Sequence, residues 1–413
     1  MAIIGVLFFI FGFVTWLNGS LIPFLKVICD LNEFQALFVT FAFYIAYTVM
    51  ALPMAYLLEK TGYKNGMALG LAVMVAAALL FIPAAMSASF ILFLIALFTL
   101  GTGLTVLQTA SNPYIVCIGD IKSAAMRISI MGLINKSAGV IVPLLFSAFI
   151  LSGIGSIEDL SSEAKEALAL KLITPYIIMA VVLRGLIALV KFSSLPELEF
   201  PKETQEKEKS IFEFPRVVLG AIALFFYVGI EVIAGDTIGL YGQHLGMENY
   251  TALTSFTMIF MVLGYLIGVV FIPKYLLQEK ALLLSSFFGV LFLLGVASSS
   301  TQSSTISEIL WGWSGVRTLP DTITFVALLG FANALVWPTI WPLALEGLGR
   351  HTAKGSALLI MAIAGGAILP LIFGKIAQVS GDMQSTYLIG IVCYAFILFY
   401  AIKGHKISSW KSE

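Results

Sequence analysis

Two carboxylates and one ammonium group stand in stretches of this chain that are otherwise apolar. Glu231 and Asp236 lie between residues 225 and 236, and Lys136 lies in a separate apolar segment. An ionisable side chain costs several kcal/mol in hydrocarbon, so such residues usually face a water-filled cavity or an oppositely charged partner. These three residues are therefore the first candidates for a functional site.

The depth of Lys136 indicates that it needs a partner. It follows Arg127 by nine residues, which corresponds to about 13 Å along a helix. A lysine reaches toward the membrane surface only by the length of its own side chain. Glu231 and Asp236 are both candidate partners, and the sequence leaves the choice between them open.

Amides and indoles recur at similar depth in other apolar segments. An amide donates and accepts hydrogen bonds, and an indole face covers the C–H face of a sugar. The combination suits a neutral polyol, although any single amide could instead bond to a neighbouring helix. We predict a binding site formed by the set as a whole. The candidate substrate-binding residues are Asn18, Gln108, Asn112, Asn135, Asn333, Trp337 and Trp341.

Other chemistries lack the residues that they need. The three histidines and three cysteines show no metal-binding spacing, and we expect no metal and no cofactor. Lys and Arg equal Asp and Glu at 23 each, without a basic face for nucleic acid. Glu231 and Asp236 are five residues apart, about 140° around a helix, and no nucleophile–base pair accompanies them. We therefore do not expect an enzyme.

The composition indicates that lipid is the main solvent of this chain. Of its 413 residues, 60% are hydrophobic and 11% charged, against about 25% charged in soluble domains. A bilayer core of about 30 Å needs about 20 apolar residues as helix, and the runs lack the alternation of barrel strands. The predicted fold is all-α and integral to the membrane. Its twelve spans are 3–26, 36–58, 66–86, 90–118, 128–152, 172–194, 216–242, 250–275, 281–299, 321–347, 355–379 and 384–403.

The distribution of basic residues predicts the orientation. With the N-terminus inside, sixteen Lys and Arg fall on the cytoplasmic side and five outside, as the positive-inside rule requires. Both termini are then cytoplasmic, in a multi-pass protein of the cell (inner) membrane. The first segment is apolar as far as Leu25 and lacks the basic start and cleavage site of a leader, so we interpret it as the first span.

The two halves of the chain repeat one another in the same order. Leu7-Phe8-Phe9 with Gly12 matches Leu224-Phe225-Phe226 with Gly229, and similar motifs surround Pro143 and Pro370. Such halves place a substrate near the midplane and rock around it. We predict a cavity between the first, fourth, fifth, seventh, tenth and eleventh spans. The expected parts are a six-helix bundle over 1–194, a cytoplasmic linker over 195–215, a second six-helix bundle over 216–403 and a cytoplasmic tail over 404–413.

Two charged residues near the cytoplasmic ends of spans are candidates for gating. Glu346 ends the tenth span and Arg127 begins the fifth. We expect Glu346 to pair with a basic residue such as Arg127 or Arg350. Short stretches between other spans complete the outline. We expect a short outer helix over Ser156–Lys171 and an outer interfacial loop over Ser298–Pro320.

Three motifs carry a family resemblance over essentially the whole chain. They are Asn18-x-x-Leu21-Ile22-Pro23, Gln108-Thr109-Ala110-Ser111-Asn112-Pro113 and Glu346-Gly347-Leu348-Gly349. The chain resembles the major facilitator superfamily, and more narrowly its fucose/glucose/galactose–cation symporters. The glucose/galactose branch is the more similar one, because it also has Gln at the place of Gln108. The resemblance implies secondary-active uptake of a monosaccharide driven by H⁺ or Na⁺.

The chain departs from the family at positions that concern coupling. Fucose symporters have Leu-Asn-Asp where this chain has Leu17-Asn18-Gly19, so their proton-coupling acid is absent. The family's sugar-binding Asn matches Asn135, but the Ser after it is Lys136 here. Under the repeat, Gly19 corresponds to Asp236. Asp236, Glu231 and Lys136 are therefore the predicted coupling residues.

Several functions remain open at this point. The leading one is uptake of a glucose- or galactose-like hexose by alternating access, with a cation as co-transported ion, in a monomer embedded in the lipid bilayer. Uptake of an amino or anionic sugar such as N-acetylglucosamine is an alternative, as is uncoupled uniport with Lys136 replacing the cation. A transport-dead sugar sensor is the alternative of a different class. It would need a signalling domain, and only ten residues follow Lys403.

Overall fold

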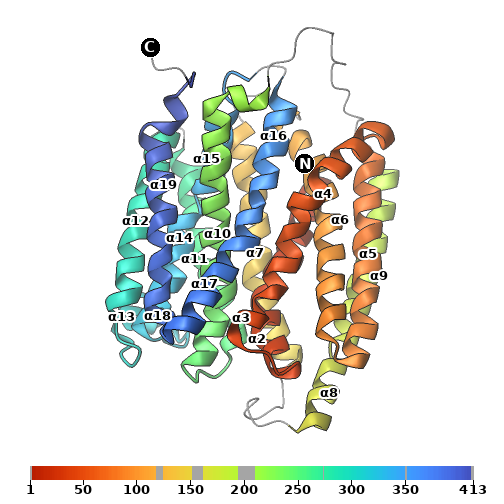
Figure 1. Cartoon of the computed structure of the whole chain (residues 1–413), viewed down its shortest axis with the longest axis vertical. Coiled ribbons are helices and arrows are strands. Elements are labelled where there is room, and N and C mark those ends of the chain that lie inside the picture. The colour runs from red at the N-terminus through yellow and green to blue at the C-terminus, as the bar shows by residue number, and fades with distance from the viewer. Residues whose placement is uncertain are drawn as a thin grey trace.

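The chain folds into a bundle of long, roughly parallel helices (Figure 1). The structure is a computed structural model, and it describes residues 2–117, 124–150, 161–193, 210–272, 274–348 and 351–410. Throughout these residues the regular structure is helical, without strands. Twelve helical segments within the described residues are long and apolar enough to cross a membrane. A helix forms hydrogen bonds between its own backbone polar groups, for which lipid offers no partners. The predicted fold class, an all-α membrane protein of two six-helix bundles, is confirmed.

The first half of the chain contains nine α-helices in the described residues. They are α1 (Ala2–Trp16), α2 (Asn18–Ile28), α3 (Glu33–Ala36), α4 (Phe38–Thr61), α5 (Tyr63–Ser87), α6 (Phe90–Cys117), α7 (Ala124–Ile150), α8 (Ser162–Leu170) and α9 (Ile173–Phe192).

The second half contains ten α-helices and several short 3₁₀ turns in the described residues. The α-helices are α10 (Pro215–His244), α11 (Thr254–Phe271), α12 (Gln278–Ser298), α13 (Thr305–Trp311), α14 (Asp321–Asn333), α15 (Val336–Leu345), α16 (Thr352–Met361), α17 (Gly365–Ser380), α18 (Met383–Thr386) and α19 (Gly390–Ile402). The 3₁₀ turns are η2 (Ile211–Glu213), η3 (Tyr250–Ala252), η4 (Gly312–Ser314), η6 (Ala362–Ala364), η7 (Tyr387–Ile389) and η8 (Gly404–Lys406).

The observed spans agree with the expected ones to within a few residues at most ends, and they differ in their continuity. The first span is interrupted at one residue, Leu17, between α1 and α2, and Leu17 itself keeps helical backbone angles. The tenth is divided between α14 and α15. Within the expected outer loop over Ser298–Pro320, the structure places the short helix α13 and the turn η4. The short helix predicted in Ser156–Lys171 is α8, whose preceding residues 151–160 lie outside the described part.

Four helix pairs make the most extensive contacts between the two bundles. The second span α4 packs against α16 and α17, α7 packs against α11, and α2 packs against α10. Figure 1 shows α4 beside α16 and α17 in the middle of the molecule. We call these contacts the seam between the halves. We call the end where α9 finishes and α10 begins the linker end, and the opposite end, which carries α3, the α3 end.

Two glycines allow helices within each half to approach closely. A Cβ placed on Gly12 of α1 would overlap the backbone carbonyl of Asn135 in α7. A Cβ on Gly365 of α17 would overlap the carbonyl of Phe225 in α10. Small residues at such crossings let helix backbones meet in lipid, where packing replaces the hydrophobic effect. The first helix of each half is thereby held against the fifth.

The α3 end of the seam is closed by backbone contact between α2 and α10. A Cβ on Gly19 would lie 3.1 Å from the carbonyl oxygen of Gly235, and one on Gly239 would lie 3.1 Å from that of Gly19. The Ser20 hydroxyl donates to the carbonyl of Thr251 at 2.7 Å. These contacts join the halves without long side chains.

The domain boundaries fall where the structure describes little. Residues 194–209, most of the predicted linker over 195–215, lie outside the described part, so that boundary stays a prediction. Its described end forms η2, just before Pro215 starts α10. The tail is described to Trp410, whose indole N–H donates to the Phe212 carbonyl at 2.7 Å.

Candidate functional site

An ion pair crosses the seam midway along two helices. The Nζ of Lys136 in α7 lies 2.6 Å from Oε1 of Glu231 in α10. Both residues are buried. Tyr227, one turn before Glu231, donates its hydroxyl to the same oxygen at 2.8 Å. Of the two predicted partners of Lys136, Glu231 is thus the one that it binds here.

The indole of Trp16 covers the ammonium group of Lys136. Its ring centroid lies 4.2 Å from Lys136 Nζ, within the range of a cation–π contact. Its N–H donates to Oδ1 of Asn135 at 3.4 Å. The amide of Asn135 donates in turn to the carbonyl of Phe8 at 3.3 Å. A predicted sugar-binding residue and a predicted coupling residue therefore share one neighbour.

Asp236 is completely buried, and neither of its carboxylate oxygens has a hydrogen-bond partner among the described residues. It follows Val232 by one helical turn and so lies on the same face of α10. Val232 packs with Tyr44 of α4 around Gly366 of α17, so this face of α10 is directed toward the seam. The charges of Glu231 and Lys136 act on Asp236. A buried carboxylate without a partner requires a proton, a cation or a movement that supplies a donor.

Three aromatic rings lie in a row beside Glu231. The rings of Tyr227 and Trp337 are 6.2 Å apart, and those of Trp337 and Trp341 are 5.5 Å apart. The buried indole N–H of Trp341 has no acceptor within the described residues. Rings with a free donor beside charged groups offer a sugar both apolar faces and hydrogen bonds.

The other predicted substrate-binding residues are spread over the bundle. Gln108 donates to the hydroxyl of Tyr47 at 3.0 Å, between α6 and α4. Asn18 begins α2 and is buried, with an amide N–H group that has no acceptor in the described part. Asn333 accepts from Tyr394 of α19 at 2.8 Å and is fully buried. Asn112 lies in α6, and its side chain is outside the described ones.

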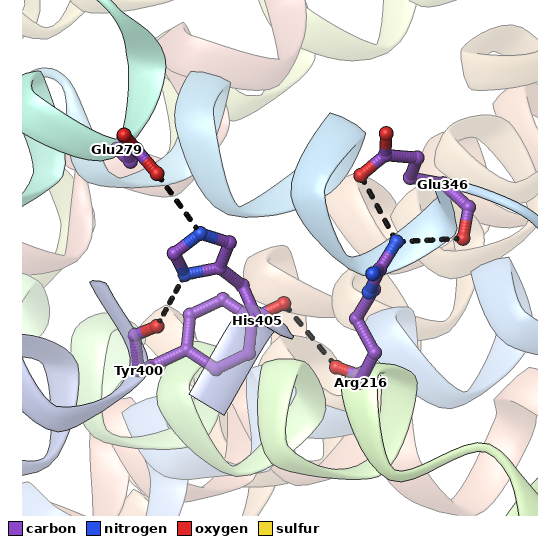
Figure 2. Close-up of polar contacts among 5 residues, drawn as sticks. All are labelled: Arg216, Glu279, Glu346, Tyr400 and His405. Atoms are coloured by element: carbon purple, nitrogen blue, oxygen red, sulfur yellow. Dashed lines mark hydrogen bonds and ion pairs between the residues drawn. The ribbon is translucent and has the colours of Figure 1, made fainter. Parts of the chain in front are cut away.

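The predicted gating residues lie at the linker end. Glu346 pairs with Arg216, at 2.9 Å between Oε2 and Nη1 (Figure 2). The expectation that Glu346 has a basic partner is met, but by a residue that we did not name. Arg127 is buried and donates to the carbonyl of Ile115 at 2.8 Å, while Arg350 lies outside the described residues.

The same region ties four helices of the second half together. The Tyr400 hydroxyl donates to the Arg216 carbonyl at 3.2 Å (Figure 2). The imidazole of His405 places Nδ1 2.8 Å from the Tyr400 carbonyl and Nε2 3.1 Å from Glu279. The ends of α10, α12, α15 and α19 are thereby connected.

Sequence reasoning missed three aromatic members of the site. Tyr227 could have been predicted from the sequence, because it precedes Glu231 by four residues and residues at this spacing are neighbours on a helix. Trp16 and Tyr47 could not, since their roles depend on helices distant in sequence. An aromatic residue in an apolar span is ordinarily part of the packing.

Comparison with known proteins decides the family. A model of the Major Facilitator Superfamily matches residues 4–371. The chain belongs to this superfamily. A glucose/galactose transporter of Brucella abortus biovar 1 (strain 9-941) is 35% identical over 97% of this chain and 92% of its own length. A putative glucose/galactose transporter of Helicobacter pylori (strain J99 / ATCC 700824) is 34% identical over 97% and 95%.

More distant relatives agree. The L-fucose-proton symporter of Escherichia coli (strain K12) is 27% identical over 97% of this chain and 92% of its own. A crystal structure of the superfamily transporter FucP in the outward conformation matches with a TM-score of 0.74, at 24% identity over 97% of both chains. The likeness to FucP supports the fold. The relatives confirm the predicted resemblance to the fucose/glucose/galactose–cation symporters.

Proposed function

We propose that this protein is a secondary-active transporter that takes up a monosaccharide, a glucose- or galactose-like hexose, by alternating access. The proposal has its main support in one observation, the Lys136–Glu231 ion pair across the seam. A transporter that rocks about a central site must rearrange whatever joins its halves there. The names of the relatives support a sugar as substrate.

The substrate site in this proposal lies between the aromatic row and Asn135. Trp337 and Trp341 offer ring faces, and Asn135 offers an amide close to the ion pair. Gln108, Asn112 and Asn18 belong to the first half and would contribute further hydrogen bonds as the halves move. Asn333 is the weakest member, because its described contact is with α19.

Coupling in this proposal resides in Asp236, Glu231 and Lys136. A cation, H⁺ or Na⁺, that occupies Asp236 neutralises a buried charge beside the ion pair, and this changes the attraction between Lys136 and Glu231. Sugar binding and cation binding then act on the same contact across the seam. Glu346 with Arg216, and Arg127, serve as gating residues at the linker end.

A second transport mode is favoured by the same ion pair. Lys136 already supplies a positive charge to Glu231, so it could replace a mobile cation and give an uncoupled uniporter. Its ammonium could also bind an anionic sugar or the acetamido oxygen of N-acetylglucosamine. These modes differ from cation symport in their dependence on ion gradients.

The proposal includes a location. Both termini are cytoplasmic in the cell (inner) membrane, the protein acts as a monomer, and the closed α3 end faces outward. The conformation described is then closed toward the outside.

Uptake into proteoliposomes tests the function. The purified protein is assayed with D-glucose, D-galactose, L-fucose and N-acetylglucosamine, while the pH gradient and the Na⁺ gradient are varied separately. Accumulation that follows one gradient supports symport with that ion. Saturable uptake that only equilibrates supports the uniporter. Saturable uptake of none contradicts transport and favours the sensor.

A further inference from the structure

Trp16 touches two parts of the site with one side chain. Its ring lies over the Lys136 ammonium and its N–H donates to Asn135. The residue is only 1% exposed and ends α1, just before the break at Leu17. Its place in the fold is therefore buried, near the middle of the first span.

The indole also bridges the two halves. A Cβ on Gly139 of α7 would lie 2.7 Å from Trp16 Cδ1, and one on Gly235 of α10 would lie 2.5 Å from Cζ3. The two glycines thus meet different edges of the ring, one from each half. Gly235 immediately precedes Asp236. With Met258 and Tyr265 of α11, the indole forms a small apolar cluster at the seam.

We propose that Trp16 is a positioning residue for coupling. It holds the Lys136 ammonium at the seam against Glu231, and it links the position of that ammonium to Asn135. The inference rests on the proposed roles of Lys136, Glu231 and Asn135 in sugar transport. It adds a residue through which a change at the sugar site alters the position of the Lys136 ammonium in the ion pair.

The physical reason lies in how the ammonium is stabilised. Glu231 is the hydrogen-bond acceptor that the described residues provide to the Lys136 ammonium, so the ring face supplies much of its remaining stabilisation. A cation–π contact is stronger when both groups are shielded from water, and it is strongest for Trp. A phenyl ring keeps part of this attraction, and a leucine side chain keeps none.

Movement of the halves reaches the ammonium through the ring as well as through Glu231. If α10 withdraws, Gly235 leaves its edge of the indole and the ring gains room to turn. A turned ring uncovers Lys136 and loses its bond to Asn135 in the same step. The contacts at the sugar site and at the ion pair then change together. An aliphatic side chain at this position has neither contact and could not link them.

The test compares Trp16→Phe, Trp16→Leu and a control, Phe81→Leu, in proteoliposomes with D-glucose and D-galactose. Phe81 is a fully buried ring that stacks on Tyr176 between α5 and α9, away from the seam. Gradient-driven accumulation and sugar exchange are measured separately, with the melting temperature of each variant. We expect Trp16→Leu to lower accumulation about tenfold or more while exchange stays within about threefold.

Trp16→Phe should keep most of the accumulation, because part of the ring–cation attraction remains. Phe81→Leu should leave the ratio of accumulation to exchange unchanged even if it lowers the melting temperature. Equal loss of accumulation and exchange in Trp16→Leu, or a wild-type ratio, would overturn the inference.

A second comparison keeps the inference testable if Trp16→Leu does not fold. Trp16→Phe and Lys136→Met are made singly and together, and the melting temperature of each protein is measured. If the ring of Trp16 stabilises the ammonium, Trp16→Phe lowers the melting temperature less where Lys136 is absent. An equal loss in both backgrounds contradicts this. Failure of the wild type to transport any sugar would instead overturn the proposed function itself.

Discussion

Lys136 and Glu231 join the two halves of the molecule through an ion pair that lies midway along α7 and α10. Neither residue has a neighbour of opposite charge within its own helix turn, so each depends on the other half for its partner. Tyr227 and Trp16 complete the surroundings from the two sides. The ion pair therefore links the two halves of the molecule and does not stabilise a single helix locally.

Breaking this pair should cost more stability than removing it. Lys136→Met or Glu231→Gln leaves one buried group without its partner, at a cost of about 3–5 kcal/mol. The double variant leaves neither member of the pair charged and should recover most of this loss. Melting temperatures of the four proteins in detergent measure the coupling energy of the pair. Additive effects of the two substitutions would show that the pair does not act as a unit.

Asp236→Asn should abolish gradient-driven accumulation while sparing exchange. The amide cannot take up a cation or a proton as a carboxylate does, yet it occupies nearly the same volume. Asp321→Asn is a matched control, because Asp321 is also buried but accepts a hydrogen bond from the Ile306 N–H at 2.8 Å. It should keep the wild-type ratio of accumulation to exchange. Unchanged accumulation in Asp236→Asn would remove Asp236 from the coupling mechanism.

Gly12→Ala should destabilise the first half. The new methyl group meets the backbone carbonyl of Asn135, and overpacking of this kind costs about 1–3 kcal/mol. Gly185→Ala in α9 is the control, because a Cβ there meets no atom within 4 Å in the described structure. Alanine favours a helix over glycine by about 1 kcal/mol, so this variant should be neutral or slightly more stable. Unfolding curves that rank the two variants in the opposite order would contradict the close approach.

The Arg216–Glu346 pair should affect rate more than stability. The Glu346 side chain is 68% exposed, and exposed pairs contribute at most about 1 kcal/mol. If Glu346 is a gating residue, Glu346→Arg slows or unbalances sugar exchange, and Arg216→Glu in the same protein restores it. Initial exchange rates measure this. A single variant with wild-type rates from both sides of the membrane would exclude a gate at this pair.

Cys29 provides a test of sidedness through its reactivity. It lies beyond α2 at the α3 end, where burial and the nearby Asp30 raise the pKa of its thiol from 9.0 to about 11. Because a raised pKa lowers the thiolate fraction, at pH 8 about one thiol in a thousand is ionised instead of about one in ten. In a Cys117→Ser, Cys393→Ser background, an impermeant maleimide added outside cells should label Cys29 slowly, faster as pH rises.

Asp30→Asn removes part of the cause and should raise the labelling rate at pH 8. Labelling at the rate of an ordinary thiol would contradict the buried environment of Cys29. Labelling only after the membrane is permeabilised would contradict the outward location of the α3 end.

The sequence predicted the helices well because lipid leaves a chain few alternatives. Each span appears as an apolar run of about 20 residues. The number and order of the spans follow from the positions of these runs. The breaks at Leu17 and between α14 and α15 were not predicted, because neither carries a sequence signal as strong as a run of charged residues. Asn18 and Asn333 lie beside these interruptions, but a single polar residue in an apolar span does not predict where a helix is interrupted.

The site was predicted in part for a similar reason. Lys136, Glu231 and Asp236 stand out because charge is rare at such depth. Their mutual arrangement, with Glu231 paired and Asp236 without a partner in the described structure, depends on how α7 meets α10 across the seam. Trp16 could not be distinguished from other buried aromatics, since its function depends on where three helices place their neighbours.

The first span is divided between the two halves. Its α1 segment packs chiefly on α7 of the first half, whereas α2 packs most extensively on α10 of the second. A boundary between moving bodies therefore runs through Leu17, inside a helix, as well as through the linker. When the halves part, the span must either leave α10 or bend near Leu17. Leu17 keeps helical backbone angles, so a bend there would distort a span that runs from Ile3 to Ile28, close to the indole of Trp16.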